Sequence, residues 1–217
     1  MNVVAVTIPR WQWRTVAADL SWLFKRLPVP LGGPGRRFEE TYLICARSSH
    51  SAVLRGDRLE VRWRKETAPE GFELWDTILD IALPFHATDL DRLWTAWGLP
   101  PPVMRAEYPT VTSLLDEAIV AAAPLVAAIG VTRHRHETFF HGIACSVETI
   151  EVARSIHLQS FSIEHEDPSL MAHLLAGLGL KAADNINLVQ SLRSALDLPQ
   201  VEAGNQTWQK RSNASSS

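Results

Sequence analysis

The sequence predicts an α+β fold in which mostly antiparallel strands are joined by hairpins and helices. Three observations lead to this class. From Arg37 the residues read as a strand, with Phe38 and Glu40 on one side of it. Gly56 and Asp57 separate two further extended segments, which is typical of a β-hairpin. Asp167 and Pro168 precede four leucines at helical spacing, which predicts a capped helix whose buried stripe consists of Leu170, Leu174, Leu175 and Leu178.

The other predicted elements follow the same rules of periodicity and punctuation. A short amphipathic helix is expected before the prolines that begin at Pro28. His141 and Gly142 mark a turn between strands. In chain order the elements are a helix over 19–26, strands over 37–44, 52–55, 58–64 and 72–83, a helix over 88–98 capped by Thr88, a strand over 103–111, a helix over 113–123, two or three strands over 129–166, and helices from Pro168 and over 187–196.

The length suits one domain or a tightly fused pair. The chain has 217 residues, and single hydrophobic cores remain workable up to roughly 250 residues. The hydrophobic fraction of 46% excludes a wholly disordered chain. We expect an N-terminal segment over 1–36, a main domain over 37–200, and a polar, flexible tail over 201–217.

Charge and composition exclude several functional classes. Lys and Arg number 21 against 24 Asp and Glu, so the net charge of −3 argues against a general nucleic-acid binder. The longest apolar stretch, Ala118 to Val131, is too short for a membrane span and contains Pro124. Cys45 and Cys145 form neither a disulfide framework nor a metal-binding pattern. With no secretory signal in view, the expected location is cytoplasmic.

Charged residues are nevertheless sorted by strand face. Alternation places five of them on one face of a single strand: Arg58, Glu60, Arg62, Arg64 and Glu66. The sorting recurs in Arg133-x-Arg135-x-Glu137 and in Ser160-x-Ser162-x-Glu164-x-Glu166. Two interpretations are open. The charged face is simply solvated, or the strands close into a barrel with a charged interior and helices cover its apolar outside.

A charged barrel interior would suit a polyanionic ligand. Guanidinium groups bind phosphate oxygens in a bidentate manner, and carboxylates hold Mg²⁺ or Mn²⁺ through hard oxygen ligands. The two residue types occur together on the sorted faces. The residue pattern therefore admits a metal-assisted phosphate site.

The C-terminal half resembles domains of the CYTH, or triphosphate tunnel, family. The resemblance rests on the segment from Arg133 to Glu148, on the Glu164-x-Glu166 strand that runs into Pro168, and on Gly177–Leu180 and Asp184–Asn187. It extends more loosely over Phe38 to Leu83. The family fold is an antiparallel eight-stranded barrel, and its members include adenylate cyclases and thiamine, inorganic and RNA triphosphatases. The resemblance implies a CYTH-like antiparallel β-barrel with helices packed outside.

The resemblance also implies roles for particular residues. Phosphate contacts fall to four arginines: Arg62, Arg64, Arg133 and Arg135. Ligands for Mg²⁺ or Mn²⁺ fall to Glu164 and Glu166, with Glu148 and Glu40 as additional carboxylates. The family's opening Glu-x-Glu-x-Lys signature is incomplete over Arg37–Ile44, where Glu40 is followed by Tyr42 and Ile44. No catalytic residue is assigned.

Three functions follow from these observations. The first is binding of a small triphosphate- or polyphosphate-type anion, with metal-dependent hydrolysis by the protein acting as a triphosphatase. The second is a degenerate, non-catalytic CYTH-like binding or interaction module. The third is a structural protein whose charged face is only solvated. A homodimer is left open, and binding to a membrane or to nucleic acid in general is not expected.

Other candidate sites are better explained by packing. His134 and His136 lie on the face opposite Arg133 and Arg135, so an outer surface is the better explanation for them. Four tryptophans fall at apolar-face positions and are expected in the core: Trp63, Trp75, Trp94 and Trp97. Trp11 and Trp13 share a strand face and are candidates for a partner-binding patch.

Overall fold

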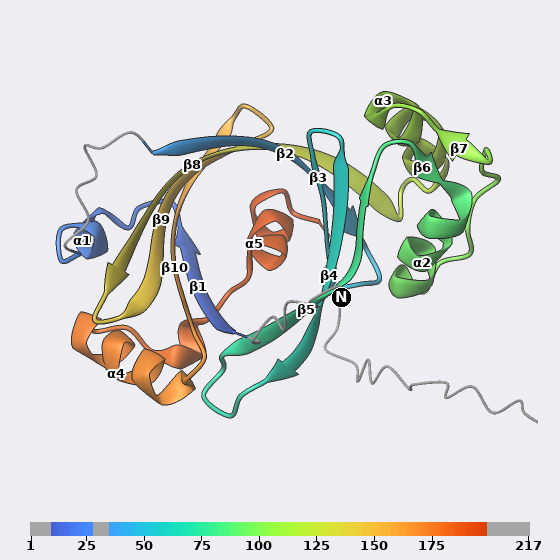
Figure 1. Cartoon of the computed structure of the whole chain (residues 1–217). Coiled ribbons are helices and arrows are strands. Elements are labelled where there is room, and N and C mark those ends of the chain that lie inside the picture. Colours follow the sequence, from blue (N-terminus) through green and yellow to red (C-terminus); the bar gives the residue numbers. More distant parts are fainter. Residues whose placement is uncertain (1–9, 28–34, 199–217) are drawn as a thin grey trace, which may run out of the picture.

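A closed antiparallel β-barrel forms the centre of the molecule (Figure 1). The structure is a computed structural model that describes residues 10–27 and 35–198. Going round the barrel, the strands are β1 (Trp11–Ala17), β10 (Ile156–His165), β9 (Ile143–Val152), β8 (Val126–Phe140), β2 (Arg36–Cys45), β3 (Ser51–Arg55), β4 (Arg58–Thr67) and β5 (Glu73–Ala82). The predicted α+β class and the antiparallel barrel are confirmed.

The barrel closes at a short seam between its first and its fifth strand. Only Trp11–Leu74 and Gln12–Glu73 pair between β1 and β5 in the described chain. Beyond these two pairs, the residues around Ile186 lie along the edge of β1. The Ile186 N–H donates to the Arg14 carbonyl at 2.8 Å. This segment leads directly into the last helix, so closure of the barrel also positions that helix.

Strand alternation separates two chemically different faces. In β4, Leu59 and Val61 are fully buried on the outer side, whereas Glu60 and Arg62 line the interior. Successive residues of a strand point to opposite faces, so an outside that is covered by helices leaves the alternate, charged residues inside. The interpretation of a charged interior is therefore correct for Glu60 and Arg62, whereas Arg58, Arg64 and Glu66 at the ends of the same face are exposed.

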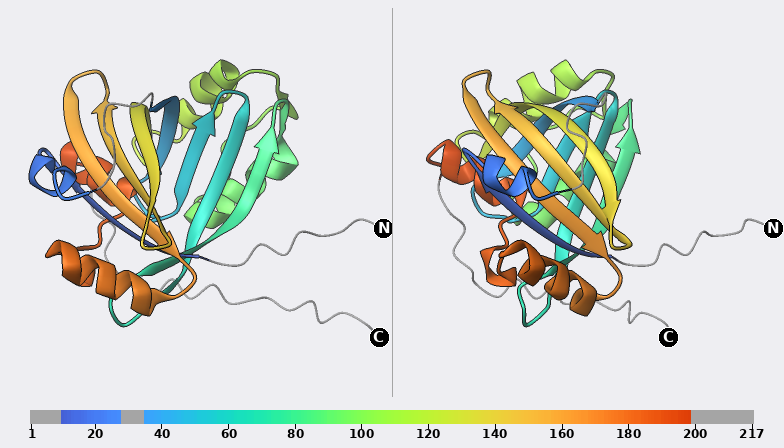
Figure 2. Two further views of the ribbon diagram at one scale, coloured as in Figure 1. Left: turned by 60° about the vertical axis from the view of Figure 1, so that its left-hand side comes forward. Right: turned by 90° about the vertical axis from the view of Figure 1, so that its left-hand side faces the viewer.

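Two groups of helices cover the outer face (Figure 2). The insertion between β5 and β8 packs on β2–β5 through Trp94 and Trp97. It contains β6 (Phe85–His86), α2 (Ala87–Trp97), β7 (Glu107–Tyr108), α3 (Val111–Ser113) and the π-helical turn η1 (Leu114–Ile119). On the other side, α1 (Ser21–Phe24) and α4 (Pro168–Leu178) cover β1, β9 and β10 around Trp13 and Phe161. Gly179 ends α4 with a φ of 75°, a conformation that favours glycine.

The last helix plugs one end of the barrel and does not cover its outer face. A 3-10 turn, η2 (Ala182–Asp184), precedes α5 (Leu188–Ala195), which sits within the ring of strands in Figure 1. Leu188, Val189 and Leu192 pack against apolar residues of β2, β3, β8 and β9, among them Val53 and Ile150. Packing of an apolar helix face against these side chains closes one end of the lumen and leaves the charged half open.

The structure corrects several local predictions. The first barrel strand, β1, lies within the predicted N-terminal segment 1–36, so the barrel domain begins before residue 37. Its inward positions are Gln12, Arg14 and Val16, and a carboxylate pair is missing there too. The strand predicted over 103–111 shortens to the two residues of β7, and α2 begins after His86 without a side-chain cap from Thr88.

Some predicted burial is also wrong. Trp13 is fully buried, not part of a surface patch. Trp75 lines the interior, whereas Trp94 and Trp97 are core residues as predicted. Leu170 was predicted to lie in the buried stripe of α4, but 48% of it is exposed.

No helix of the described residues is long and apolar enough to cross a membrane. The predicted cytoplasmic location and the tail over 201–217 stay predictions, the tail because it lies outside the described residues.

Candidate functional site

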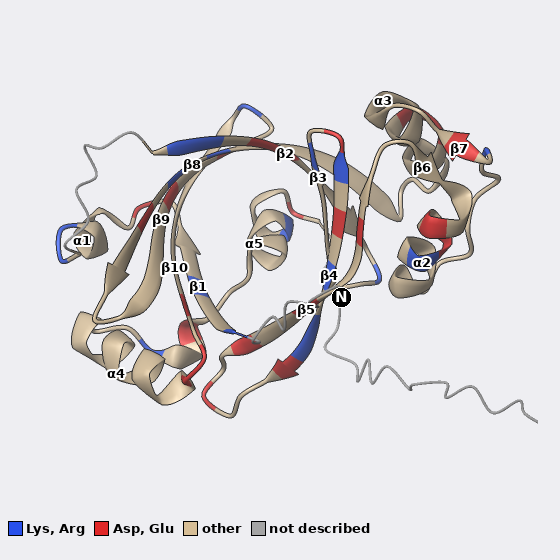
Figure 3. Ribbon diagram, viewed as in Figure 1, with Lys and Arg blue, Asp and Glu red and all other residues tan. Residues whose placement is uncertain are grey.

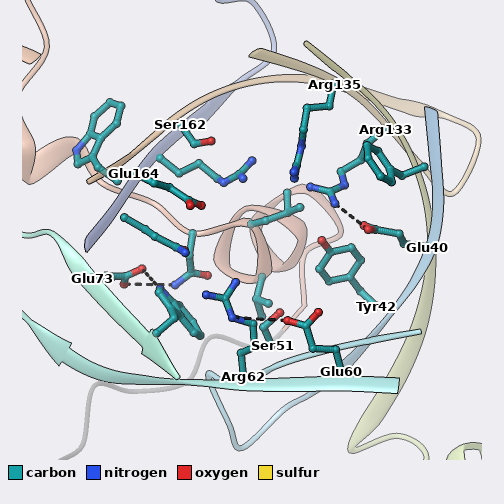
Figure 4. Close-up of a pocket in the computed structure, with 18 of the residues that line it drawn as sticks. Glu40, Tyr42, Ser51, Glu60, Arg62, Glu73, Arg133, Arg135, Ser162 and Glu164 are labelled. Atoms are coloured by element: carbon teal, nitrogen blue, oxygen red, sulfur yellow. Dashed lines mark hydrogen bonds and ion pairs between the residues drawn. The ribbon is translucent and has the colours of Figure 1, made fainter. Parts of the chain in front are cut away.

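The open half of the barrel contains a polar cavity of about 390 Å³ (Figure 4). Its walls come from seven strands, and the residues before and at the start of α5 form its floor. Guanidinium groups approach it from several walls: in the view of Figure 4, Arg135 and Arg62 point toward the centre from opposite sides. Figure 3 shows the same basic and acidic stretches facing one another across the ring. Barrel closure thus brings together charges that are far apart in sequence.

Glu148 is the central carboxylate of the arginine-rich wall. It is fully buried and accepts from three guanidinium groups, with Arg14 Nη1 2.9 Å, Arg135 Nε 2.6 Å and Arg133 Nη1 3.2 Å from its oxygens. Burial alone would raise the pKa of Glu148, but the three arginines, Arg14 foremost, lower it to about 2. The carboxylate is therefore ionised at neutral pH and holds the three guanidinium groups in place.

Glu40 repeats this arrangement on β2, with β8 lying between it and the strand of Glu148. Its Oε1 accepts from Arg55 Nε at 2.6 Å and from Arg133 Nη2 at 2.7 Å. Burial opposes its ionisation, and the attraction of Arg133 and Arg55 lowers the pKa of Glu40 below its usual value. Glu40 Oε2 and Arg133 Nε are buried without a hydrogen-bond partner. Arg133 thus bridges both carboxylates and keeps unused donor capacity.

Arg62 forms the opposite wall with fewer protein contacts. Its Nε lies 3.6 Å from Glu60 Oε1, and its guanidinium carbon lies 6.0 Å from the centre of the Trp75 ring. Such a cation–π contact orients the guanidinium without using its hydrogen-bond donors. Because 31% of the Arg62 side chain is exposed, its donors remain available to a ligand in the cavity.

A third polar cluster joins the barrel wall to the inner helix. Buried Glu73 accepts from Arg64 Nη1 at 2.8 Å, from Trp75 Nε1 at 3.1 Å and from Asn187 Nδ2 at 3.5 Å. Asn187 also caps α5, since its Oδ1 accepts from the Gln190 N–H at 3.0 Å. The positive end of α5 therefore faces the cavity at a fixed position.

The predicted phosphate-binding residues divide into two groups. Arg62, Arg133 and Arg135 line the cavity together. Arg64 does not line it, and its guanidinium is paired with Glu73. Whether any of them contacts phosphate stays a prediction.

The predicted metal ligands do not form one set of carboxylates. Glu164 lines the cavity, whereas Glu166 is exposed beyond the end of β10. Glu148 and Glu40 are directed at arginines, as described above. Among the described residues, no group of three or more His, Cys, Asp or Glu is arranged to hold a metal ion. Of the four predicted ligands, only Glu164 and the unpaired Oε2 of Glu40 offer oxygens to the cavity, so these residues do not by themselves supply the several oxygen ligands that Mg²⁺ or Mn²⁺ takes.

Several site residues were missed by sequence reasoning. Arg14 belongs to β1, where only the tryptophans on the opposite face drew attention; the alternation that pairs Trp11 with Trp13 also placed Gln12 with Arg14. Arg55 ends β3 beside the predicted hairpin turn. Glu73 was not singled out, and Asn187 was noted only as part of the family resemblance and as the start of a helix, since the role of both residues depends on where α5 packs.

Comparison with known proteins supplies no family assignment. No family model matches the chain, and no curated protein matches it in sequence. Solved structures are similar to it over most of its length. A proposed adenylate cyclase from Bacillus halodurans matches with 12% identity and a TM-score of 0.45, over 85% of this chain and 98% of its own. A Pyrococcus horikoshii protein matches with 11% identity and a TM-score of 0.45, over 84% and 98%. A conserved hypothetical protein from Pyrococcus furiosus matches with 12% identity and a TM-score of 0.44, over 84% and 99%.

Proposed function

We propose that the barrel cavity binds a small anion with several phosphate-type groups. The observation that carries the proposal is the ratio of donors to acceptors in the arginine-rich wall. Four arginines share the two buried carboxylates Glu40 and Glu148: Arg14, Arg55, Arg133 and Arg135. Four guanidinium groups carry roughly twenty N–H donors, against about eight lone-pair positions on these two carboxylates and about eight more on Glu60 and Glu137, which pair with Arg55 and Arg135. The excess donors suit the oxygens of an anionic ligand.

The arrangement favours an extended anion over a single phosphate. Arg135 and Arg62 face each other across the cavity, and the positive end of α5 lies at its floor. A ligand with several charged groups contacts both walls at once, whereas one phosphate contacts one of them. Because α5 closes the other end, a long nucleic-acid strand does not pass through the lumen. This size selection agrees with the small phosphorylated partner expected from the sequence.

The same geometry favours binding without metal-dependent hydrolysis. Glu148 and Glu40 hold arginines, so releasing them to a cation would leave buried guanidinium groups without counter-charges. Of the predicted functions, the non-catalytic CYTH-like module therefore has the stronger support. Metal dependence and triphosphatase activity stay predictions, and the titrations described below test them. The homodimer also stays a prediction, which sedimentation analysis would test.

Isothermal titration calorimetry with inorganic triphosphate and with monophosphate tests the proposal. We expect triphosphate to bind at one site and more tightly than monophosphate. Arg62→Gln should weaken it by about ten-fold or more, since hydrogen bonds to charged groups contribute about 1.5–3 kcal/mol. Arg58→Gln is the matched control: Arg58 is on the same strand, does not line the cavity, and pairs with Asp80 at 2.7 Å. It should leave the affinity within two-fold.

Two further arms separate the alternatives. Titration with and without Mg²⁺ or Mn²⁺, followed by an assay for released phosphate, distinguishes a binding module from a hydrolase. Release that depends on metal and is lost in Glu164→Gln would favour the hydrolase. Absence of triphosphate binding, or equal weakening by Arg62→Gln and Arg58→Gln, would reject an anion site in the cavity.

A further inference from the structure

A second cavity lies on the outside of the barrel, between α4 and the turn that joins β8 to β9. Its volume is about 420 Å³, which is within the range of small-molecule sites. The apolar lining comes from three elements: Phe140 at the end of β8, Ile143 at the start of β9, and Leu170, Leu174 and Leu178 on α4. We call this cavity the α4 groove. It shares no lining residue with the barrel cavity.

The composition of α4 is unusual for a helix at the surface. Between Pro168 and Leu178 it has no Lys, Arg, Asp or Glu, and in Figure 3 the whole helix lacks charged residues. Surface helices normally present charged residues to water on the face that is turned away from the core. Here Leu170 is 48% exposed and lines the groove. An exposed apolar surface next to a concave site is typical of a ligand-binding surface.

Basic groups from three separate segments line the same groove. They are Arg26, which follows α1, His141 in the β8–β9 turn, and His173 on α4. None of the residues that line the groove is acidic. His141 has a φ of 50°, rare for a residue other than glycine, and its ring lies 4.3 Å from that of Phe140. The turn therefore holds this imidazole against the apolar lining.

Arg26 is positioned with donors to spare. Its Nη1 donates to the Leu178 carbonyl at 3.2 Å, and its guanidinium carbon lies 5.6 Å from the centre of the Trp22 ring. These contacts fix the guanidinium beside the apolar lining and occupy one of its five N–H groups. A bidentate pair with a carboxylate would use two of the others.

From this geometry we propose that the α4 groove binds an apolar carboxylate, of which a medium-chain fatty acid is the simplest example. The chain lies along Leu170 and Leu174, and the carboxylate pairs with Arg26. The basic groups and the lack of acidic lining residues select an anion, and the apolar lining selects its hydrocarbon part. This site is independent of the anion site proposed inside the barrel.

Calorimetry of the full chain with decanoate, below its micelle-forming concentration, tests the proposal. One decanoate should bind per chain. Octanoate should bind about fifteen-fold more weakly, the factor for two methylene groups at about 0.8 kcal/mol each. Decanol, which has the chain without the charge, should bind at least ten-fold more weakly than decanoate.

Variants separate the α4 groove from other surfaces. Arg26→Gln and Leu170→Gln should each weaken decanoate by about ten-fold. Val120→Gln, at a valine next to η1 that is 63% exposed, should leave the affinity unchanged, as should Arg62→Gln in the barrel cavity. Both groove variants change exposed side chains, and the circular dichroism spectrum checks their folding.

Three results would overturn the proposal. The first is the absence of decanoate binding to the wild-type chain. The second is equal binding of decanoate and decanol with no effect of Arg26→Gln, which indicates unspecific apolar adsorption. The third is competition between decanoate and inorganic triphosphate together with a loss in Arg62→Gln, which places the carboxylate in the barrel cavity.

Discussion

The barrel cavity and the α4 groove are nearly equal in volume, about 390 and 420 Å³, yet they are built in opposite ways. The barrel cavity arises because strand alternation turns every second side chain inward, and buried ion pairs such as Glu148–Arg135 keep those side chains in place. The groove arises because one uncharged helix lies across the outside of the same sheet. We infer that electrostatic pairing positions the groups of the first cavity, and apolar packing those of the second.

The largest effect is expected from removing the charge at the centre of the barrel cavity. Glu148→Leu should lower the free energy of unfolding by about 3–5 kcal/mol, because three buried or half-buried guanidinium groups lose their common counter-charge. Denaturant unfolding measures this change. The matched control is Glu137→Gln, which removes an exposed partner of the same Arg135 at 3.3 Å and should cost less than about 1 kcal/mol. Similar losses in both variants would show that burial of the ion pairs does not matter.

The same carboxylate predicts how stability depends on pH. Its pKa in the folded state, about 2, lies below the ordinary value of 4.5. The group therefore stabilises the fold fully above pH 4.5 and loses this contribution as the pH falls toward 2, by a total of about 3 kcal/mol. Unfolding free energies measured from pH 5 to pH 2 should decline more steeply in the wild type than in Glu148→Gln. Parallel curves would contradict the assigned ionisation.

In the α4 groove, apolar packing is expected to contribute to the free energy of unfolding. Leu174 is 8% exposed and forms part of the groove, so Leu174→Ala should cost about 2–3 kcal/mol of unfolding free energy. Leu170→Ala, at a position on the same helix that is 48% exposed, should change it by about 0.5 kcal/mol or less. Both values come from thermal or denaturant unfolding. If the exposed position costs as much as the buried one, Leu170 packs more tightly than the structure indicates.

The smallest effects concern the caps of the helices that border the two cavities. Asn187 caps α5, and Asp167 caps α4 by accepting from the Ser169 N–H at 2.8 Å. Replacing either residue by alanine should cost about 1 kcal/mol. Only Asn187→Ala should also weaken triphosphate binding, because Asn187 lines the barrel cavity and contacts Glu73. Equal anion affinity in the two variants would separate the start of α5 from the anion site.

The two cavities also differ in how far the sequence could predict them. Alternation was enough to place Arg62 on the charged face of β4, and Arg133 and Arg135 on the charged face of β8. Turn residues located the hairpins. Pairing between strands is a long-range property, so the sequence did not show that Arg14 would complete the cluster around Glu148. For the same reason two of the four predicted carboxylate ligands, Glu148 and Glu40, turned out to serve as partners for arginines.

The inner position of α5 and the α4 groove were beyond sequence patterning for a physical reason. An amphipathic helix packs its apolar face against whichever apolar surface is available, and the inside and outside of a barrel both offer one. The spacing of Leu188 and Leu192 did not indicate whether they would pack against the inner or the outer face of the barrel. The pattern of α4 predicted a buried stripe that included Leu170, whereas the structure leaves this leucine at the edge of a groove.

The most direct test of the central claim is a crystal structure of the full chain with inorganic triphosphate. The account predicts phosphorus atoms inside the barrel cavity, between Arg62 on one wall and Arg135 on the other, with Glu148 still bound to its arginines. An anion found instead on the outer surface or in the α4 groove, with the barrel cavity holding only solvent, would contradict it.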